Sequence, residues 1–377
     1  MAKNNFLNSL ILPTALLSGT IIGAGIFALP YVFDKAGTIT GLIYLVVFTA
    51  VLALIHLKYA DIINATPTDH RFAGYAEIYL GKIGKISAIL MTVIGTIFIL
   101  TVYLILCVSF INLLAPGLPD FYKILIFWVL GSLAIYWKVE RLAISELLVT
   151  MGITLIIFLV FAFGLKNFSE VILSKPKFNA SHIFLPYGPI LFALSGRVAI
   201  PALLGYFRRN NLSQSLSRPA IVLGTIFPAV VYLLFVIGVL NLSAVVSEDS
   251  ISGLVSRLPS RALELLGILG IVSLWSTYIV IGRDIKKSLE HDFNFPRILI
   301  FLFVILAPLG LYFYGLQDFL QLISVTGGIF IGLEGIFIIL MRQKACLPTG
   351  MALQRKNLLD YILLAIFVGG IIHALLY

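Results

Sequence analysis

Charged residues are scarce in this chain. Asp, Glu, Lys and Arg together make up 11% of its 377 residues, whereas 60% are hydrophobic. A soluble protein of this length needs far more charged surface to stay in solution. Apolar runs of about 20 residues recur from end to end, and each is long enough to cross a bilayer as a helix. The runs are continuous, without the alternation of barrel strands, so the sequence predicts an all-α polytopic membrane protein.

Sequence signals of catalysis are also missing. The chain has no H-E-x-x-H pattern, P-loop or nucleophile elbow, which argues against an enzyme, an ATP-driven pump and a bound cofactor. Its two cysteines, Cys107 and Cys346, are expected on opposite membrane faces, so no disulfide is predicted. The net charge of +9 comes from basic residues in short loops between apolar runs. That placement fits the positive-inside rule better than a nucleic-acid partner.

Eleven membrane-spanning helices are predicted, and we number these spans in chain order. The first run starts near Leu10 and continues to Phe33, which favours a span over a cleaved signal peptide. Most Lys and Arg fall in the connections that are cytoplasmic if the N-terminus is cytoplasmic and the C-terminus outside, so we expect this orientation in the cell (inner) membrane. No soluble domain is large enough to stand alone, so residues 1–377 form one transmembrane domain. The predicted spans are 10–33, 38–63, 85–114, 121–137, 141–165, 184–207, 218–241, 262–288, 296–314, 318–341 and 358–376.

Two connections are longer than turns. Residues 72–80 place aromatic residues and Leu at helical spacing, which predicts a short amphipathic helix on the cytoplasmic interface. Residues 242–261, between spans seven and eight, mix polar residues with Ile251, Leu254 and Leu258. This pattern predicts an outer helical loop that caps a vestibule.

The first span carries helix-breaking residues at its middle. Gly23, Ala24 and Gly25 lie near the expected bilayer midplane, and Pro30 follows. Glycine costs about 1 kcal/mol in a helix relative to alanine, and proline removes a backbone donor. Unwound backbone at that depth is tolerated only where it is buried in protein or lines a cavity. The alternative is helix packing, because Gly19 and Gly23 also form a G-x-x-x-G face.

The sixth span has matching features. Ser195, Gly196 and Arg197 fall at its midpoint, and Pro201 follows. An arginine at that depth costs roughly 2.5–3.5 kcal/mol, so it should face a polar cavity or a counter-ion. Interruptions five helices apart are the sequence pattern of an inverted-repeat transporter with a midplane site. The pair of patterns therefore favours two broken helices over simple packing.

At these residues the chain resembles the amino acid–polyamine–organocation superfamily, specifically its aromatic and hydroxy amino acid permease branch. Residues 19–30 resemble the first-helix signature of that branch, and Ser195-Gly196-Arg197 with Ile200-Pro201 is similar to its sixth-helix signature. Residues 323–328 in span ten resemble a further segment. The order of spans, amphipathic helix and outer loop matches along nearly the whole chain.

The resemblance implies a LeuT-type 5+5 inverted repeat with discontinuous helices one and six. Its repeats would cover about 10–165 and 184–341, and 358–376 would be an added helix. It also implies a binding site between the two breaks. There the substrate carboxylate would meet the N–H groups of Gly23, Ala24 and Gly25, in agreement with the dipole argument for helix N-termini. The substrate amine would face carbonyls near Ile22 and Ala193.

Arg197 departs from the branch, which often has His at the aligned position. A permanent cation there either binds an acidic substrate or pairs with a carboxylate such as Glu146 or Glu334.

Further candidates line the spans around the breaks. Ser273, Ser276 and Thr277 in span eight are hydroxyls where the fold often places a sodium site, although such side chains commonly bond to their own helix. Many proton-driven relatives carry a Lys in span five, and here the interior of that span has none. The coupling ion is therefore sodium, or a proton on Glu146 or Glu334.

Three more side chains are candidates by position. Tyr103 in span three and Trp275 in span eight either line the pocket or pack between helices. Asp284, at the cytoplasmic end of span eight, either forms an inner gate with Lys3 or Lys58 or is a solvated interfacial group.

The predicted function is secondary active uptake of an amino acid, of the aromatic or hydroxy class implied by the resemblance, through alternating access. Its partners would be that substrate and the lipid bilayer, with the oligomeric state left open. One alternative is a carrier of a polyamine or an organic anion on the same fold. A channel should show a continuous polar pore lining, and the charges here are isolated; a channel or a non-transporting sensor is therefore the weaker alternative.

Overall fold

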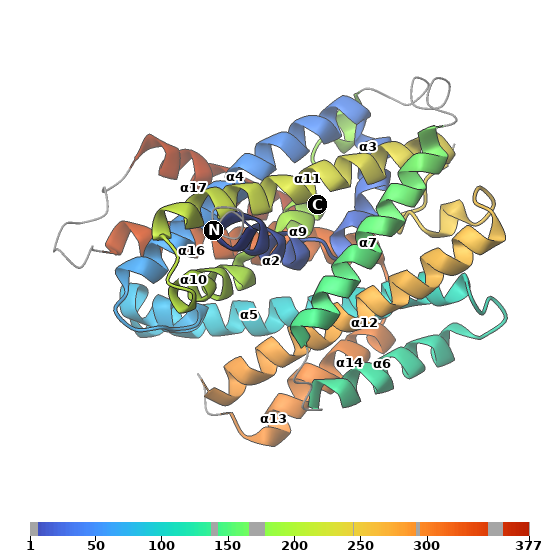
Figure 1. The fold of residues 1–377 in the computed structure, drawn as a ribbon. Helices are drawn as coiled ribbons and strands as arrows, with labels where there is room; N and C mark the ends of the chain where they lie inside the picture. The colour runs from blue at the N-terminus through green and yellow to red at the C-terminus, as the bar shows by residue number, and fades with distance from the viewer. Residues whose placement is uncertain are drawn as a thin grey trace.

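The computed structural model of the protein describes residues 7–136, 142–165, 178–243, 245–291, 295–345 and 357–376, with the backbone alone for 142–150 and 291. Every regular element in these ranges is a helix, and the helices pack side by side into one bundle (Figure 1). The all-α prediction is confirmed for the described part of the chain.

Helices occupy all eleven predicted spans. Eight segments of the described chain are long and apolar enough to cross a membrane by themselves, and a bent pair in the first span gives a ninth. The helices in the predicted fourth and fifth spans do not meet the same criteria over their described residues, so eleven crossings stay a prediction. The uninterrupted helices are α4 (Thr38–Ala65), α5 (Phe72–Asn112), α6 (Asp120–Tyr136), α7 (Leu142–Leu165), α11 (Ser217–Leu242), α12 (Ser260–His291) and α17 (Leu358–Leu376).

The first and sixth spans are interrupted where the sequence predicts it. In the first, the segments before and after Ile22 and Gly23 meet at an angle of 55°. In the sixth, the helix stops at Ser195 and Gly196. The elements are η1 (Leu7–Ile11), α2 (Leu12–Ile21), η2 (Ala24–Ala28) and α3 (Leu29–Ala36) in span one, and α9 (Tyr187–Leu194), η4 (Arg197–Ala199) and α10 (Ile200–Arg209) in span six.

Spans nine and ten each contain a π-helical turn that the sequence did not predict. In span ten this wide turn packs directly on α9: a Cβ at Gly327 would lie 1.9 Å from the carbonyl oxygen of Gly188. Only glycines permit so close a contact between backbones. The elements are α13 (Arg297–Phe301), η7 (Leu302–Leu306) and α14 (Ala307–Tyr314), then α15 (Phe319–Val325), η8 (Thr326–Ile331) and α16 (Gly332–Lys344).

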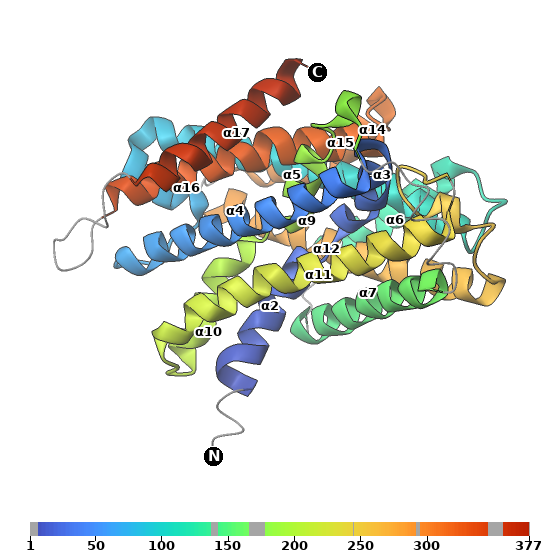
Figure 2. The same cartoon turned by 90° about the horizontal axis from the view of Figure 1, so that it is seen from above.

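The connection before span three is helical, as predicted. Residues 72–80 form the first part of α5, and Gly81 then turns the chain sharply with a φ of 79° before the span itself. A positive φ is accessible to glycine without steric cost, which explains the residue at this corner. The two arms of α5 on either side of this corner are visible in Figure 2.

The connection between spans seven and eight differs from its prediction. The expected helical loop is an irregular segment with one short 3₁₀ turn, η6 (Ser252–Leu254). The carboxylate of Asp249 accepts hydrogen bonds from the backbone N–H groups of Ile251 and Ser252, at 3.2 and 3.1 Å. Such side-chain bonds compete with helical ones and hold a turn instead. Leu254 is nevertheless fully buried, so the loop packs firmly on the bundle.

The outer surface of the bundle is apolar. On α4, Ile39, Ile43 and Val46 are each at least half exposed and follow one another at helical spacing. Exposed apolar surface on this scale requires a hydrocarbon environment. Helix α17 lies at the edge of the bundle beside α16, with the described N-terminal segment on the opposite side (Figure 2). The protein is therefore a multi-pass membrane protein with its interrupted helices inside.

Candidate functional site

The two interruptions lie against each other. A Cβ at Gly25 would lie 2.5 Å from the Cα of Ala193, and a Cβ at Gly196 would lie 2.5 Å from Cγ1 of Ile21. Neither gap admits a larger residue without a shift of the chain. The glycines that weaken the two helices are therefore also what lets the breaks touch.

The backbone at both breaks is extended. Ile22 has a ψ of 99° and Gly23 a φ of −145°, and Ser195 has a ψ of 125°. The change of conformation leaves N–H groups at the start of η2 and carbonyls at the ends of α2 and α9 without helical hydrogen bonds. Donors and acceptors of backbone origin thus meet inside the bundle, as the sequence predicted.

The freed carbonyls are held by a tyrosine that the sequence reasoning missed. The hydroxyl of Tyr232, on α11, lies 2.7 Å from the carbonyl oxygen of Ile21 and 2.8 Å from that of Ala193. Its side chain is fully buried. One hydroxyl thereby joins the last turns of both half-helices.

A histidine fixes the sixth-span break from the other side. Nε2 of His56, on α4, accepts the backbone N–H of Gly196 at 3.2 Å, and Nδ1 lies 3.0 Å from Oγ1 of Thr225. Thr225 donates its own hydroxyl hydrogen to the carbonyl of Ile221, so Nδ1 must carry the imidazole proton. His56 therefore acts as a neutral structural bridge between α4, α11 and the sixth-span break.

The predicted tyrosine of span three does reach the first break. The Tyr103 hydroxyl lies within hydrogen-bonding reach of the backbone N–H of Ala24 and of the Thr277 side chain. A Cβ at Gly23 would lie 3.1 Å from the same hydroxyl. The structure thus brings together four of the sequence candidates, from spans one, three and eight.

The candidate side chains of α12 do not all lie at the breaks. Thr277 donates to the carbonyl of Ser273 at 3.1 Å, so it bonds to its own helix as well as facing the break. Ser273 is buried and Ser276 half-buried on the same stretch. Trp275 points elsewhere: a Cβ at Gly131, on α6, would lie 3.7 Å from its indole nitrogen. The structure therefore packs Trp275 between α12 and α6, away from the breaks.

Arg197 is paired within the protein. Its guanidinium lies 2.6 Å from a carboxylate oxygen of Glu334, on α16, and both side chains are more than four-fifths buried. It also lies over the ring of Phe72, 4.3 Å from the centroid, and within hydrogen-bonding reach of Tyr59. The other proposed partner, Glu146, belongs to the part of α7 whose side chains are outside the described set.

The predicted gate residue has a different partner from the expected one. Asp284 is 2.9 Å from Arg71, which precedes α5 and also donates to Ser288 at 2.8 Å. Lys58 pairs instead with Asp360 of α17, and Lys3 is outside the described residues. Of the alternatives for Asp284, the gate contact with Lys58 is not formed, because Lys58 is buried facing α17, whereas Asp284 lies in a partly exposed interfacial pair.

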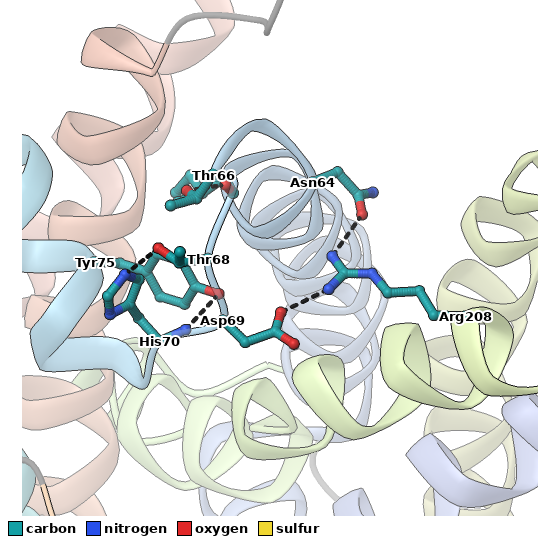
Figure 3. Close-up of polar contacts among 8 residues, drawn as sticks. Asn64, Thr66, Thr68, Asp69, His70, Tyr75 and Arg208 are labelled. Carbon is teal, nitrogen blue, oxygen red and sulfur yellow. Dashed lines mark hydrogen bonds and ion pairs between the residues drawn. The ribbon is translucent and has the colours of Figure 1, made fainter.

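Ion pairs between different elements gather at the end of the bundle where spans two, six, eight and ten approach the connections that the sequence predicts to be cytoplasmic. Figure 3 shows one of them, in which the Arg208 guanidinium faces both Asp69, at 2.6 Å, and Asn64. The pairs between elements at this end are Lys58–Asp360, Asp61–Arg218, Asp61–Arg342, Asp69–Arg208, Arg71–Asp284 and Arg197–Glu334.

The opposite end of the bundle contains a cavity of about 410 Å³. It lies between α5, the loop after α11 and the start of α15, and its lining includes Glu248, Asp249 and Asp318. Partial burial raises the pKa of the Glu248 carboxyl, and the nearby carboxylates of Asp318 and Asp249 raise it further. The cavity is thus acidic, and it lies at the end of the bundle opposite the ion pairs, whose end we call the packed end.

Comparison with known proteins adds a family and a fold. A sequence model of the tryptophan/tyrosine permease family matches residues 7–374. No curated protein matches the chain. The structure of MhsT in complex with L-phenylalanine is similar, with a TM-score of 0.66 at 15% identity, over 98% of this chain and 97% of that one.

Two further solved structures are similar. A manganese transporter from Eremococcus coleocola has a TM-score of 0.59 at 14% identity, over 99% of this chain and 86% of that one. Mhp1, a nucleobase-cation-symport-1 family transporter, has a TM-score of 0.61 at 15% identity, over 97% and 90%. These likenesses confirm the predicted LeuT-type fold, and at such identities they show the fold alone.

Proposed function

Since the chain belongs to the tryptophan/tyrosine permease family, we propose that it carries an aromatic amino acid across the cell membrane, with the two helix breaks as its binding site. The protein is a permease and not an enzyme. One observation carries the proposal: the breaks lie in contact and bring together backbone donors and acceptors that take no part in helical hydrogen bonds. A zwitterion needs both kinds of group, and helix termini supply them without a charged side chain.

In this proposal the substrate carboxylate binds the N–H groups of Gly23, Ala24 and Gly25. The Tyr103 hydroxyl, beside the Ala24 N–H, adds a further donor. The substrate amine faces the carbonyls at the ends of α2 and α9, near Ile22 and Ala193. A carbonyl oxygen has two lone pairs, so these acceptors keep capacity beyond the bond to Tyr232.

An aromatic cluster next to the first break supports an aromatic substrate. Phe27 of η2 packs edge-to-face with Phe110, at 5.1 Å between ring centroids, and with Phe235, at 5.6 Å. A substrate ring inserted among them would gain contacts of the same geometry. This placement would put the ring on the side of the break that faces α3.

The pairing of Arg197 favours a substrate without net charge. Its guanidinium is neutralised by Glu334 and covered by the Phe72 ring, so binding an acidic substrate there would require breaking a buried ion pair. The same observation weighs against the organic-anion alternative. We assign Arg197 to the closure of the packed end rather than to substrate contact.

Alternating access would then proceed by opening that end. The pairs Arg197–Glu334 and Arg71–Asp284 join elements of the first repeat or the sixth span to α16 and α12. Their separation would release one half of the bundle from the other. With the N-terminus in the cytoplasm, this end faces the cytoplasm and the acidic cavity faces outward.

The coupling ion follows one of two routes. Thr277 lies beside the first break, which supports a sodium ion bound by Ser273, Ser276 or Thr277 with carbonyls of span one. Glu334 or Glu146 would serve a proton instead. Uptake into proteoliposomes with external sodium replaced by choline separates the routes, since full residual transport would exclude sodium.

A thermal-shift screen tests the substrate. Purified protein is heated with each of the common amino acids, a polyamine and an organic anion. A ligand at 100 times its dissociation constant stabilises the folded state by about 2.7 kcal/mol, so a true substrate raises the melting temperature. We expect tryptophan, tyrosine or phenylalanine to give the largest shift. A shift with the polyamine or the anion alone would contradict the proposal.

A further inference from the structure

Tyr232 has an unusual position for a tyrosine in an apolar helix. Its side chain is fully buried, and its hydroxyl lies within 2.8 Å of two carbonyl oxygens, those of Ile21 and Ala193. A hydroxyl has one hydrogen to donate. Two acceptors therefore share a single proton, and neither is satisfied by it alone.

The two carbonyls have the same electrostatic character. Each belongs to the last turn of a half-helix, α2 or α9, and each half-helix stops there. A helix C-terminus corresponds to roughly half a negative charge. Two such ends pointing at one buried spot favour a positive charge between them, and interrupted helices commonly place a cation there.

Within the described part of the chain, the side-chain donor to these two carbonyls is Tyr232, and no basic side chain contacts them. The basic residue nearest in sequence, Arg197, is directed to Glu334. The positive end of the Tyr232 O–H dipole is what faces the two oxygens.

We propose that the Tyr232 hydroxyl replaces a metal cation at the junction of the two half-helices, so that this spot does not bind a metal ion in the native protein. A small side chain at position 232 turns the same spot into a site for a monovalent cation. Tyr232 is then a positioning residue: it holds the two breaks together without a bound ion. The inference depends on the proposed transport function only for its uptake measurement.

The first test measures sodium binding without any amino acid. The melting temperatures of the wild type, Tyr232→Ser and Tyr278→Phe are compared in sodium, potassium and choline chloride. Tyr278 is a matched control, because it is a fully buried tyrosine on α12 that packs against Phe127 of α6, away from the breaks. Serine at position 232 leaves room for an ion with water beside the two carbonyls.

We expect a saturable upward shift with sodium in Tyr232→Ser that exceeds any sodium shift in the wild type and in Tyr278→Phe. Equal sodium responses in all three proteins would overturn the inference. If Tyr232→Ser is too unstable to heat, the yield of monodisperse protein is compared after solubilisation in sodium or in choline. Higher recovery in sodium, for this variant alone, is the expected result, and equal recovery would overturn the inference.

The second test uses Tyr232→Phe, which removes the oxygen but keeps the ring in place. The two carbonyls then lack a donor until the substrate amine arrives. We expect the stabilisation by a transported amino acid to be larger in Tyr232→Phe than in the wild type, with a lower maximal uptake rate. An unchanged ligand shift would contradict the positioning role. If no amino acid shifts even the wild type, the proposed function fails, while the sodium comparison still decides the role of Tyr232.

Discussion

Removal of the Glu334 carboxylate should expose how strongly the packed end of the bundle depends on one ion pair. In the variant Glu334→Ala, the guanidinium of Arg197 stays buried without its counter-ion. Breaking a buried pair from one side costs about 3–5 kcal/mol. The side chains of Arg197 and Glu334 retain 12% and 16% of their exposure, so we expect the lower end of that range.

The loss converts to a measurable change in melting temperature. If the unfolding entropy scales with chain length as in soluble proteins, about 3 kcal/mol corresponds to a drop of about 4 °C. The double variant Arg197→Met with Glu334→Leu removes both charges and keeps apolar volume. It should be more stable than Glu334→Ala, because no buried charge is left unpaired.

The assay is thermal unfolding of the purified single and double variants, followed by loss of the monodisperse peak. A matched control is Asp69→Ala, whose pair with Arg208 is largely exposed and should matter by less than about 1 kcal/mol. Arg197→Met and Glu334→Leu are also made alone. A double variant whose destabilisation equals the sum of these two would refute the reasoning, since it would show no coupling between the two charges.

Three further outcomes follow from the geometry. Gly25→Ala places a methyl group against the backbone of α9 and should reduce amino acid uptake at least tenfold. Gly205→Ala is the control, because the space around its Cβ position is open and uptake should be unchanged. Equal uptake by the two variants would contradict the contact between the breaks. Asp284→Asn removes an ion pair with Arg71 that is about half exposed, so the free energy of unfolding should change by less than about 1 kcal/mol. A cysteine introduced at the packed end should become more accessible to a thiol reagent in this variant. Unchanged labelling of that cysteine would show that the pair does not hold this end closed. The raised pKa of Glu248 means that its charged form is disfavoured in the folded state. Glu248→Gln should therefore slightly raise the melting temperature at pH 8 and not at pH 4. A rise at pH 4 and none at pH 8 would contradict the burial argument.

The coarse fold was predictable because its signals are local. Long apolar runs define the spans, and glycine and proline weaken a helix wherever they occur. Gly23, Gly25 and Gly196 therefore mark the breaks without any knowledge of the neighbouring helices. The amphipathic pattern of residues 72–80 identified a helix for the same reason.

The details of the site were less predictable because they depend on helix rotation. A helix that is apolar on all sides does not reveal which face meets its neighbours. The sequence left Trp275 open between the pocket and helix packing, and the structure packs it against α6; Tyr232 was not singled out among the apolar residues of its span. A tyrosine in the middle of an apolar span was the available signal, because a buried hydroxyl needs a partner.

Charge pairing had the same limit. The sequence suggested that Arg197 needs a carboxylate, and Glu334 was one of two partners considered. For Asp284 the sequence left open a gate with Lys3 or Lys58 and a solvated interfacial group. It did not reveal that Lys58 pairs with Asp360, which lies 302 residues away from it along the chain. Pairs at such separations depend on the tertiary fold.

The central claim, that the paired breaks form the binding site of an aromatic amino acid carrier, is tested most directly by counterflow. Proteoliposomes are loaded with unlabelled tryptophan, tyrosine or phenylalanine, and the uptake of a trace of the labelled amino acid is followed without any ion gradient. The account predicts transient accumulation of label in the wild type and its loss in Gly25→Ala, because exchange requires a carrier that binds substrate at the breaks. Accumulation that is unchanged in Gly25→Ala, or its absence with every aromatic amino acid, would contradict the account.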